Sequence, residues 1–461
     1  MNRKLFTSIL LVSFLLFSSF SYASSNVRIS YNELEICNDV FNVQNESKWT
    51  VMYYMCCDSN MEEYREPLLE NLSKIGSSND FNLLALVDGE ERFDSKIYYF
   101  NETGNKVSLN NLFGWPDEID TSDPNTLEFY CKQMMNAYPA EHYTLITYAS
   151  GGTGWQLYCL PDDSDGNHGV TIPQFASSMK YITNDGQEKI DVLFVSCAMG
   201  TIELSYEISP YVDYIIGTQD CLAKSDFIQR FYEPVWDLRN NSNMSAEEFA
   251  KRSPERLNPF SFHYFESYSG YLPILNRLLD RLPFSRLHTV LHHPSSSVIN
   301  LSKINVLAMD LSKLSSYLIL NMENKKMMDE IDTARSNVRE SGKCFSKFKV
   351  FSLFHNRYNL EFMAYDSFID LYDFIEVLKN TTSNEYLRNL CNNVIKSFNQ
   401  SIEAIKTVQG DKSHGLNIYF PSTRNLYDKF VLPGKIPCSY ENLLFSKDTK
   451  WDEFIKSYLD I

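Results

Sequence analysis

The sequence predicts an α/β protein with a parallel-rich sheet flanked by helices, followed by a helix-rich C-terminal region. Short runs of β-branched and aromatic residues alternate with amphipathic helical segments over the first half, an order typical of parallel sheets with right-handed crossovers. Beyond about Pro234 the strand pattern fades and helical periodicity dominates. The chain has 461 residues, 44% of them hydrophobic, which is enough for two or three domains and a large core.

The elements follow from local patterns. Buried strands are predicted at Trp49–Met55, Phe81–Val87, Tyr143–Tyr148, Asp191–Val195 and Val212–Gly217, with a hairpin of Lys96–Phe100 and Val107–Leu109. Helices are predicted to begin near Met61 and after Asp123, and to span Ile172–Ile182. In the C-terminal part the predicted helices are Asp310–Ile331, Ala364–Leu378 and Asn384–Ile405, with one late strand, Gly415–Phe420.

The N-terminus has the organisation of a secretory signal peptide. Arg3 and Lys4 precede the apolar run Leu5–Phe20, and small residues allow cleavage after Ala23. The alternative is that the same segment stays uncleaved as a membrane anchor, which the cleavage site argues against. No later stretch is apolar enough to span a bilayer. We therefore expect a secreted or periplasmic protein without stable membrane insertion. Its predicted parts are a signal peptide (1–23), a lead-in (24–47), an α/β domain (48–296) and a C-terminal region (297–461).

The charge balance argues against nucleic acid as a partner. The formal net charge is -17, and cleavage of the leader would leave 40 basic against 59 acidic residues. Such a surface repels nucleic acids and anionic membranes.

Metal and disulfide signals are weak. The ten cysteines match no disulfide framework and no zinc motif. Asp162, Asp163, Asp165 and Asn167 cluster hard oxygen atoms that suit calcium, although the spacing is not that of an EF-hand. The alternative is an ordinary acidic turn. We expect that no cofactor is required and that calcium is the one ion to consider.

Cys197 is the residue around which the chemistry is predicted. It lies where the buried strand Asp191–Val195 changes to helical spacing, at the carboxyl edge where open α/β sheets bind ligands. The N-terminus of a helix beside Cys197 would favour a thiolate. The alternative is a small buried cysteine without chemistry.

Several blocks together resemble the clostripain family of cysteine endopeptidases, which are exported, caspase-like proteins. The order of the blocks agrees with the family over nearly the whole mature chain. They are Trp49–Glu62, Asp123–Tyr148, Gly152–Trp155, Cys197–Glu207, Val306–Leu314, Ser367–Phe374 and Gly415–Pro421. The resemblance implies a peptide or protein as substrate or ligand.

The resemblance also implies a catalytic pair, and this chain departs from it. In the family a His-Gly pair ends the third strand, and adjacent backbone amides bind the oxyanion. Cys197 matches the nucleophile and Gly152 an oxyanion amide, but the histidine position falls at Gly151, or at Ser150 in another alignment. Neither side chain transfers a proton at neutral pH.

The specificity pocket departs as well. The family has an aspartate two residues before the cysteine, at the floor of a pocket for arginine or lysine, and Val195 stands there. Burying an unpaired cation against valine is unfavourable. Asp220 or Asp226 are the acids that could replace it.

Two functions remain open. In the first, the protein binds peptides or proteins and is catalytically impaired, since a positioned acid/base contributes ~10²–10⁴-fold in rate. In the second, it is an active cysteine endopeptidase with altered specificity and a relocated base such as His168. His142 lies at the wrong end of the sheet, and the remaining histidines, His414 among them, stand in no recognised motif.

Overall fold

The fold is known from a computed structural model, and the description covers most of the chain. Described are residues 46–59, 61–149, 154–155, 158, 160, 162, 169–195, 198–219, 224–256, 295–338, 367–407, 413–427 and 438–461, without the side chains of 224–227. The chain divides into two units, Met1–Gln44 and the compact unit Asn45–Ile461. The predicted signal peptide and nearly all of the lead-in lie outside the described residues.

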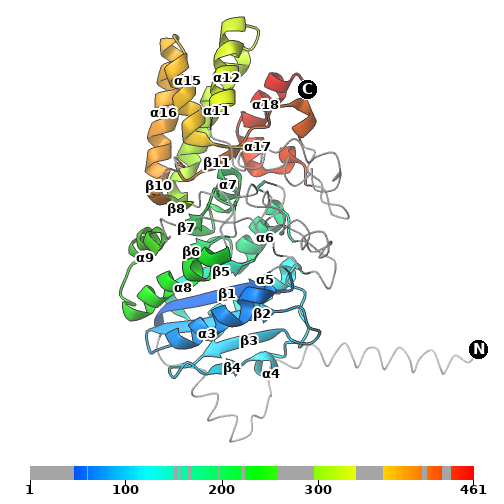
Figure 1. The fold of residues 1–461 in the computed structure, drawn as a ribbon, viewed down its shortest axis with the longest axis vertical. Coiled ribbons are helices and arrows are strands. Elements are labelled where there is room, and N and C mark those ends of the chain that lie inside the picture. The colour runs from blue at the N-terminus through cyan, green and yellow to red at the C-terminus, as the bar shows by residue number, and fades with distance from the viewer. Residues whose placement is uncertain are drawn as a thin grey trace, which may run out of the picture. The chain divides into compact units, whose positions relative to one another are not determined.

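A mostly parallel nine-stranded sheet organises the compact unit (Figure 1). The strand order is β10-β8-β7-β6-β5-β1-β2-β3-β4. Strands β1, β2, β5, β6 and β7 are mutually parallel where they pair, and β3, β4, β8 and β10 run antiparallel to their neighbours. The bounds are β1 Ser47–Cys56, β2 Phe81–Asp88, β3 Lys96–Phe100, β4 Lys106–Ser108, β5 Ala140–Tyr148, β6 Ile190–Phe194, β7 Val212–Gly217, β8 Ser295–Asn300 and β10 Ile402–Thr407. The predicted strands and hairpin are confirmed.

Helices cover both faces of the sheet. On one face, α3 (Arg65–Ile75), α8 (Lys224–Asn240) and α9 (Ala246–Arg252) share an apolar core with alternate residues of β1. The other face carries α5 (Pro124–Ala137), α6 (Ile172–Ile182) and α7 (Ile202–Ile208). A short α4 (Asn110–Phe113) follows β4, and single 3-10 turns lie at Glu62–Tyr64, Ser253–Arg256, Leu301–Lys303, Arg424–Leu426 and Tyr440–Asn442.

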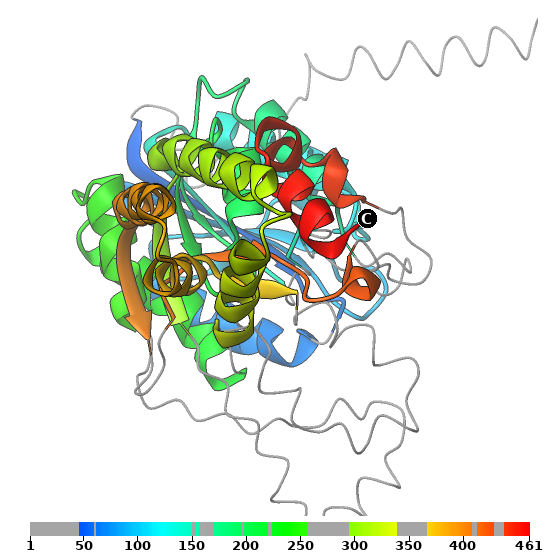
Figure 2. The same ribbon diagram turned by 90° about the horizontal axis from the view of Figure 1, so that it is seen from above.

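The C-terminal helices form a second layer, seen in front of the sheet in Figure 2. α11 (Ile304–Leu320) packs on α16 (Glu385–Ser401) and α18 (Trp451–Leu459), while α15 (Leu371–Thr381) packs on α12 (Lys325–Asn337) and α16. α17 (Leu444–Asp448) packs on α7. A two-stranded sheet of β9 (Phe368–Asp370) and β11 (Asn417–Tyr419) belongs to this layer.

The sequence analysis missed three strands, β8, β9 and β10. β9 lies within the predicted helix Ala364–Leu378, which begins only at Leu371. The helix predicted to end at Ile405 ends at Ser401, and the residues that follow form β10, which pairs antiparallel with β8. The predicted domain boundary after residue 296 falls inside β8, and β10 joins the main sheet from within the predicted C-terminal region. The division into two regions stays a prediction.

Within the described ranges, no helix combines the length and apolar character needed to cross a membrane.

Candidate functional site

The candidate site lies at the carboxyl edge of the sheet. β5 and β6 are adjacent and parallel, with Ile146 opposite Phe194, so the loops that follow them leave the same edge. The strand ends that precede the predicted histidine position and Cys197 therefore lie side by side. Four of the predicted catalytic positions, namely Gly151, Gly152, His168 and Cys197, lie outside the described residues, as does Ser150. Their roles stay predictions, and the described residues define the frame around them.

The chain on either side of residue 197 is held to β7. The Val195 amide donates to the carbonyl of Ile216 at 3.2 Å, and the Ala198 amide donates to Thr218 Oγ1 at 3.1 Å. Ala198 has φ +57°, a left-handed conformation that costs a non-glycine residue ~1–2 kcal/mol. Strained backbone of this kind concentrates at functional sites, where packing enforces it.

The predicted helix N-terminus beside Cys197 is wrong. α7 begins at Ile202, and Thr201 is its N-cap, its side chain accepting from the Leu204 amide at 3.3 Å. The Gly200 amide is instead bound to the carbonyl of Thr218 at 2.8 Å. A Cβ at Gly200 would meet that oxygen at 2.8 Å, so glycine permits this close approach. The helix begins too late for its first amide groups to adjoin position 197.

The predicted pocket residue Val195 is fully buried. Its side chain is apolar and brings no counter-charge to this position. Asp220 and the side chain of Asp226 lie outside the described residues, so their place at a pocket floor stays a prediction.

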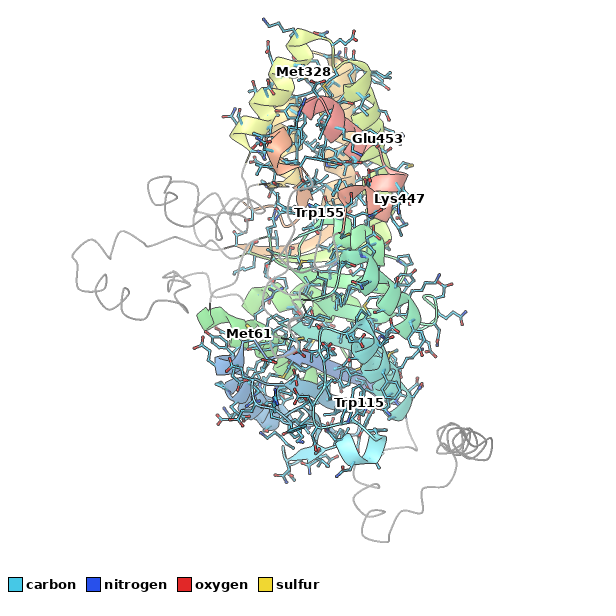
Figure 3. The ribbon with its side chains drawn as sticks, turned by 90° about the vertical axis from the view of Figure 1, so that its right-hand side faces the viewer. Met61, Trp115, Trp155, Met328, Lys447 and Glu453 are labelled. Carbon is cyan, nitrogen blue, oxygen red and sulfur yellow. The ribbon has the colours of Figure 1, made fainter. Side chains whose placement is uncertain are left out.

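The loop after β5 is packed against the C-terminal layer. The Trp155 ring lies 5.4 Å from the ring of Tyr419 and 5.3 Å from that of Tyr440, measured between centroids. Figure 3 labels Trp155, which lies between the sheet and the C-terminal helices. Gly154 has φ +69°, and a Cβ there would meet the Phe368 ring at 2.1 Å. The loop that follows the predicted histidine position is thus shaped by β9 and β11.

A buried polar network joins the end of β7 to the C-terminal layer. Gln219 Nε2 donates to Asp370 Oδ2 at 2.9 Å and to Asn417 Oδ1 at 2.8 Å. Gln219 Oε1 accepts from the Gly415 amide at 2.6 Å. The Asn417 amide in turn donates to the carbonyl of Gly200 at 2.8 Å, which ties the network to the segment after residue 197.

His414 completes this network. Its Nδ1 lies 3.1 Å from Asp370 Oδ1, and its ring stacks on Tyr372 at a centroid distance of 4.4 Å. Burial opposes the charged ring, but the hydrogen bond and charge of Asp370 outweigh it and raise the pKa of His414 above its ordinary 6.5. Burial also opposes ionisation of Asp370, yet His414, the Asp373 amide and Gln219 hold the pKa of Asp370 below 3.8.

Two glutamates of α7 anchor the C-terminal layer. Glu203 Oε1 accepts from the Tyr419 amide at 2.8 Å and from the Tyr440 hydroxyl at 2.9 Å, and Glu207 accepts from the amides that begin α17. Burial raises the pKa of both carboxyl groups from 4.5 to about 7. Both side chains are buried and bind other segments of the chain instead of facing solvent along α7.

Three buried carboxylates at the same edge could hold a cation. Oxygen atoms of Asp58, Asp88 and Asp162 lie within 4.8 Å of one another. Burial and the nearby Asp162 and Asp58 raise the pKa of Asp88 to about 8, although Ser95 donates a hydrogen bond to it. Carboxylate oxygens are ligands that calcium takes. Of the predicted calcium loop only Asp162 is described, and Asp163 and Asp165 lie outside the described residues.

Comparison with known proteins agrees with this architecture. A secreted C11 cysteine protease from Bacteroides thetaiotaomicron, solved with an irreversible peptide inhibitor, has a TM-score of 0.56 at 15% identity, over 88% of this chain and 100% of that chain. An inactive zymogen C11 protease from Parabacteroides distasonis has a TM-score of 0.54 at 15% identity, over 88% and 99%. A search of curated proteins finds no match.

The mostly parallel sheet, its helical layers and these neighbours define a caspase-like α/β protein. The family model of the clostripain family matches residues 53–458, and the chain belongs to that family of cysteine peptidases.

Sequence reasoning missed the group formed by Gln219, Asp370 and His414. Two of the family-like blocks touch it, since Asp370 lies in Ser367–Phe374 and His414 immediately precedes Gly415–Pro421. This position in and beside the family-like blocks was the only sign in the sequence that Asp370 and His414 belong to the site. The pairing itself joins residues 44 and 151 positions apart, which no local pattern reveals.

Proposed function

We propose that this protein is an exported clostripain-family member that binds peptides or proteins at the carboxyl edge of its sheet, with catalysis impaired. The observation that carries the proposal is the fully buried Val195 at the pocket position. Together with Gly151 or Ser150 at the histidine position, it removes both hallmarks of a peptidase for basic residues. Cys197 keeps the place of the nucleophile, and Gly152 keeps an amide for an oxyanion.

The chemistry left to such a site is limited. A free thiol of pKa ~8.5 is a few per cent thiolate near neutrality, so attack on a carbonyl remains available. An amide additionally needs its leaving nitrogen protonated, which glycine or serine at the histidine position does not supply. Binding should therefore be retained, while amide cleavage falls by ~10²–10⁴-fold relative to a complete pair.

The second candidate is an active cysteine endopeptidase with altered specificity and a relocated base. His168 was the predicted base and lies outside the described residues. A specific observation favours this candidate, because a histidine held by a buried aspartate lies at the same edge, beside the end of β7. This candidate also lacks the counter-charge of the family pocket at Val195.

A mixed peptide library tests the proposal. The mature protein is expected to retain peptides with no preference for arginine or lysine and to release almost no cleaved product. Strong selection for a basic residue would contradict the pocket assignment and point to Asp220 or Asp226. N-terminal sequencing of the exported protein should begin at Ser24, and retention of residues 1–23 would contradict the proposed export route.

A further inference from the structure

We propose that protons control how tightly residues 440–448 dock on α7, with Glu203 and Glu207 holding this segment at acid pH and releasing it at alkaline pH. The segment consists of the 3-10 turn Tyr440–Asn442, Leu443 and α17. α17 lies against α7 in Figure 1. Such a device acts in either of the two candidate functions, since it does not involve the predicted nucleophile.

Three side chains on one face of α7 bind both ends of the segment. Glu203 Oε1 accepts from the Tyr440 hydroxyl at 2.9 Å, and Glu207 Oε1 accepts from the Phe445 amide at 3.2 Å. Tyr206 shares this face, and its hydroxyl donates to the carboxylate of the last residue of α17 at 3.0 Å. Positions 203, 206 and 207 are neighbours on a helix surface. Two of the three anchors are therefore carboxyl groups that can gain or lose a proton.

The two carboxyl groups are buried without a cation that pairs with them. Glu203 is fully buried, Glu207 is 3% exposed, and neither forms an ion pair within the ranges that the structure describes. Glu203 Oε2 has no hydrogen-bond partner among these residues. Lys447 attracts the charge of Glu207, but its Nζ donates to the Asn442 carbonyl at 2.7 Å. A carboxylate buried in this way is unfavourable unless it is protonated.

The surroundings of Glu203 favour its neutral form. Burial is the largest influence and raises the pKa of this carboxyl group from 4.5 to about 7. Hydrogen bonds from the Tyr419 amide and the Tyr440 hydroxyl act in the opposite direction, and the charge of Glu207 adds to the rise. Asp452 on α18 acts on Tyr440, whose own pKa lies well above 10. No group that faces Glu203 therefore supplies a compensating positive charge.

The surroundings of Glu207 lead to the same balance. Burial raises its pKa from 4.5 to about 7, and the charge of Asp448 adds to the rise. The Phe445 and Leu444 amides at the start of α17 donate to the carboxyl group and oppose this rise, as does Lys447. All of these groups belong to α17, so they leave Glu207 when the segment moves away.

The other elements packed on α7 bring no further charge to the two glutamates. Their charged side chains interact elsewhere: Lys180 of α6 with Asp185, Lys313 with Asp310 on α11, and Lys303 of the 3-10 turn Leu301–Lys303 with Glu403. The titration of the clamp therefore depends on α7, β11 and the segment itself.

Docking and protonation are linked because the two states of the segment differ in how they bury these carboxyl groups. In the docked state each pKa is about 7, and water restores it toward 4.5 when the segment leaves α7. The contribution of each group to docking is complete below pH 4.5 and is lost as pH rises through 7. Each glutamate should thus increase the open population by about 30-fold between pH 5 and pH 8.

The opening reaches the loop after β5 through one aromatic contact. Tyr440 is fully buried, and its ring lies 5.3 Å from that of Trp155, which is 2% exposed. Release of residues 440–448 would remove this cover from Trp155. α18 stays in place because Trp451 packs on Phe374 and Phe420 instead of on α7. The device is therefore a local cover beside the carboxyl edge of the sheet.

Hydrogen–deuterium exchange of the full-length protein measures the opening, after correction for the pH dependence of free amide exchange. In wild type the protection of residues 440–448 should fall by at least about 30-fold between pH 5 and pH 8, while that of α18 changes far less. The double variant Glu203→Gln, Glu207→Gln keeps both acceptor oxygens without a charge. Its protection of this segment should be the same at both pH values.

Two matched controls separate titration from the loss of a contact. Burial and Asp448 raise the pKa of Tyr206 to about 12, so this hydroxyl stays protonated from pH 5 to pH 8. Tyr206→Phe should therefore lower protection by the same factor at both pH values. Asp191 is a carboxyl group at the amino edge whose pKa is also raised by burial. Asp191→Asn should keep the wild-type pH dependence of residues 440–448.

Two results would overturn the proposal. The first is equal protection of residues 440–448 at pH 5 and pH 8 in wild type. The second is the same decline in wild type and in the double variant, because other groups would then control the opening. If thermal unfolding shows that the double variant is not folded, the single variants Glu203→Gln and Glu207→Gln decide. Each should lose about half of the logarithmic pH dependence, and retention of all of it in both would contradict the proposal.

Discussion

The two histidine–aspartate pairs of this protein differ in what surrounds the carboxylate. Asp191 accepts from His142 and from the Tyr143 amide, and burial raises its pKa above 3.8. Asp370 is buried more deeply, yet its pKa is lowered.

The difference lies in the number of donors. Asp370 accepts from its histidine, from two backbone amides and from the side chain of Gln219, and these bonds offset the cost of removing the charge from water. The pair at the carboxyl edge is thus built to keep a charged carboxylate beside an imidazole. The pair at the amino edge joins the starts of β5 and β6 and packs on Trp49.

The largest expected effect is on stability. Asp370→Asn should lower the free energy of unfolding at pH 7 by ~3–5 kcal/mol, because it disrupts a buried, charged hydrogen-bond network. Asp191→Asn should cost at most ~1 kcal/mol, since burial disfavours the charged form of Asp191. Urea denaturation measures both.

The pH dependence follows from the lowered pKa of Asp370. A group with a depressed folded pKa contributes stability above its unfolded pKa and loses it as pH falls through the folded value. The gap between wild type and Asp370→Asn should therefore close below about pH 3.8. If Asp370→Asn and Asp191→Asn lower the free energy of unfolding equally at pH 7, the number of hydrogen-bond donors does not distinguish the two histidine–aspartate pairs.

A rebuilt family pair tests whether the original position can still work. Gly151→His with Val195→Asp should raise turnover of an arginine ester by ~100-fold, because it returns an acid/base and a counter-charge. Val195→Asp alone should lower the melting temperature, since the side chain at 195 is fully buried. The rebuilt protein carrying Cys197→Ala must be silent. A folded but inactive double variant would mean that other parts of the site have also changed.

A smaller effect is expected at Glu203, whose folded pKa of about 7 exceeds its ordinary 4.5. The folded state favours the protonated form, so this contribution to stability is complete below pH 4.5 and declines as pH rises through 7. Glu203→Gln keeps an acceptor for Tyr419 and Tyr440 without the buried charge. The free energy of unfolding of Glu203→Gln should exceed that of wild type by up to ~2 kcal/mol at pH 8 and should equal it at pH 5. A gain independent of pH would rule out the charge as the cause.

The smallest effect concerns the acidic cluster. Calcium at pH 8.5 should raise the melting temperature of wild type by ~1 °C, which corresponds to about 1 kcal/mol for a folded unit as long as Asn45–Ile461. Asp162→Asn should reduce the shift, because it removes one of three carboxylates within 4.8 Å. If calcium leaves the melting temperature of wild type unchanged, the three carboxyl groups bind no calcium and share protons only.

Local patterns in the sequence determined the five central strands, the hairpin and the helix Ile172–Ile182, because burial on a sheet and on a helix impose different periods on neighbouring residues. They also placed Val195 at a strand end, where it is buried. The alternation of strands and helices predicted the parallel sheet to which β5 and β6 belong.

Tertiary structure alone decided the rest. β10 continues a helical segment without a break in the pattern, so only its pairing with β8 defines it as a strand. Glu203 and Glu207 are buried because β11 and α17 cover them, which their spacing in the chain does not reveal. His414 pairs with Asp370, and Asp370 with Gln219, only because folding brings together β9, the turn before β11 and the residues that follow β7. A hydrogen bond across 151 positions leaves no periodic trace in the chain, because its two partners are selected separately by their own surroundings.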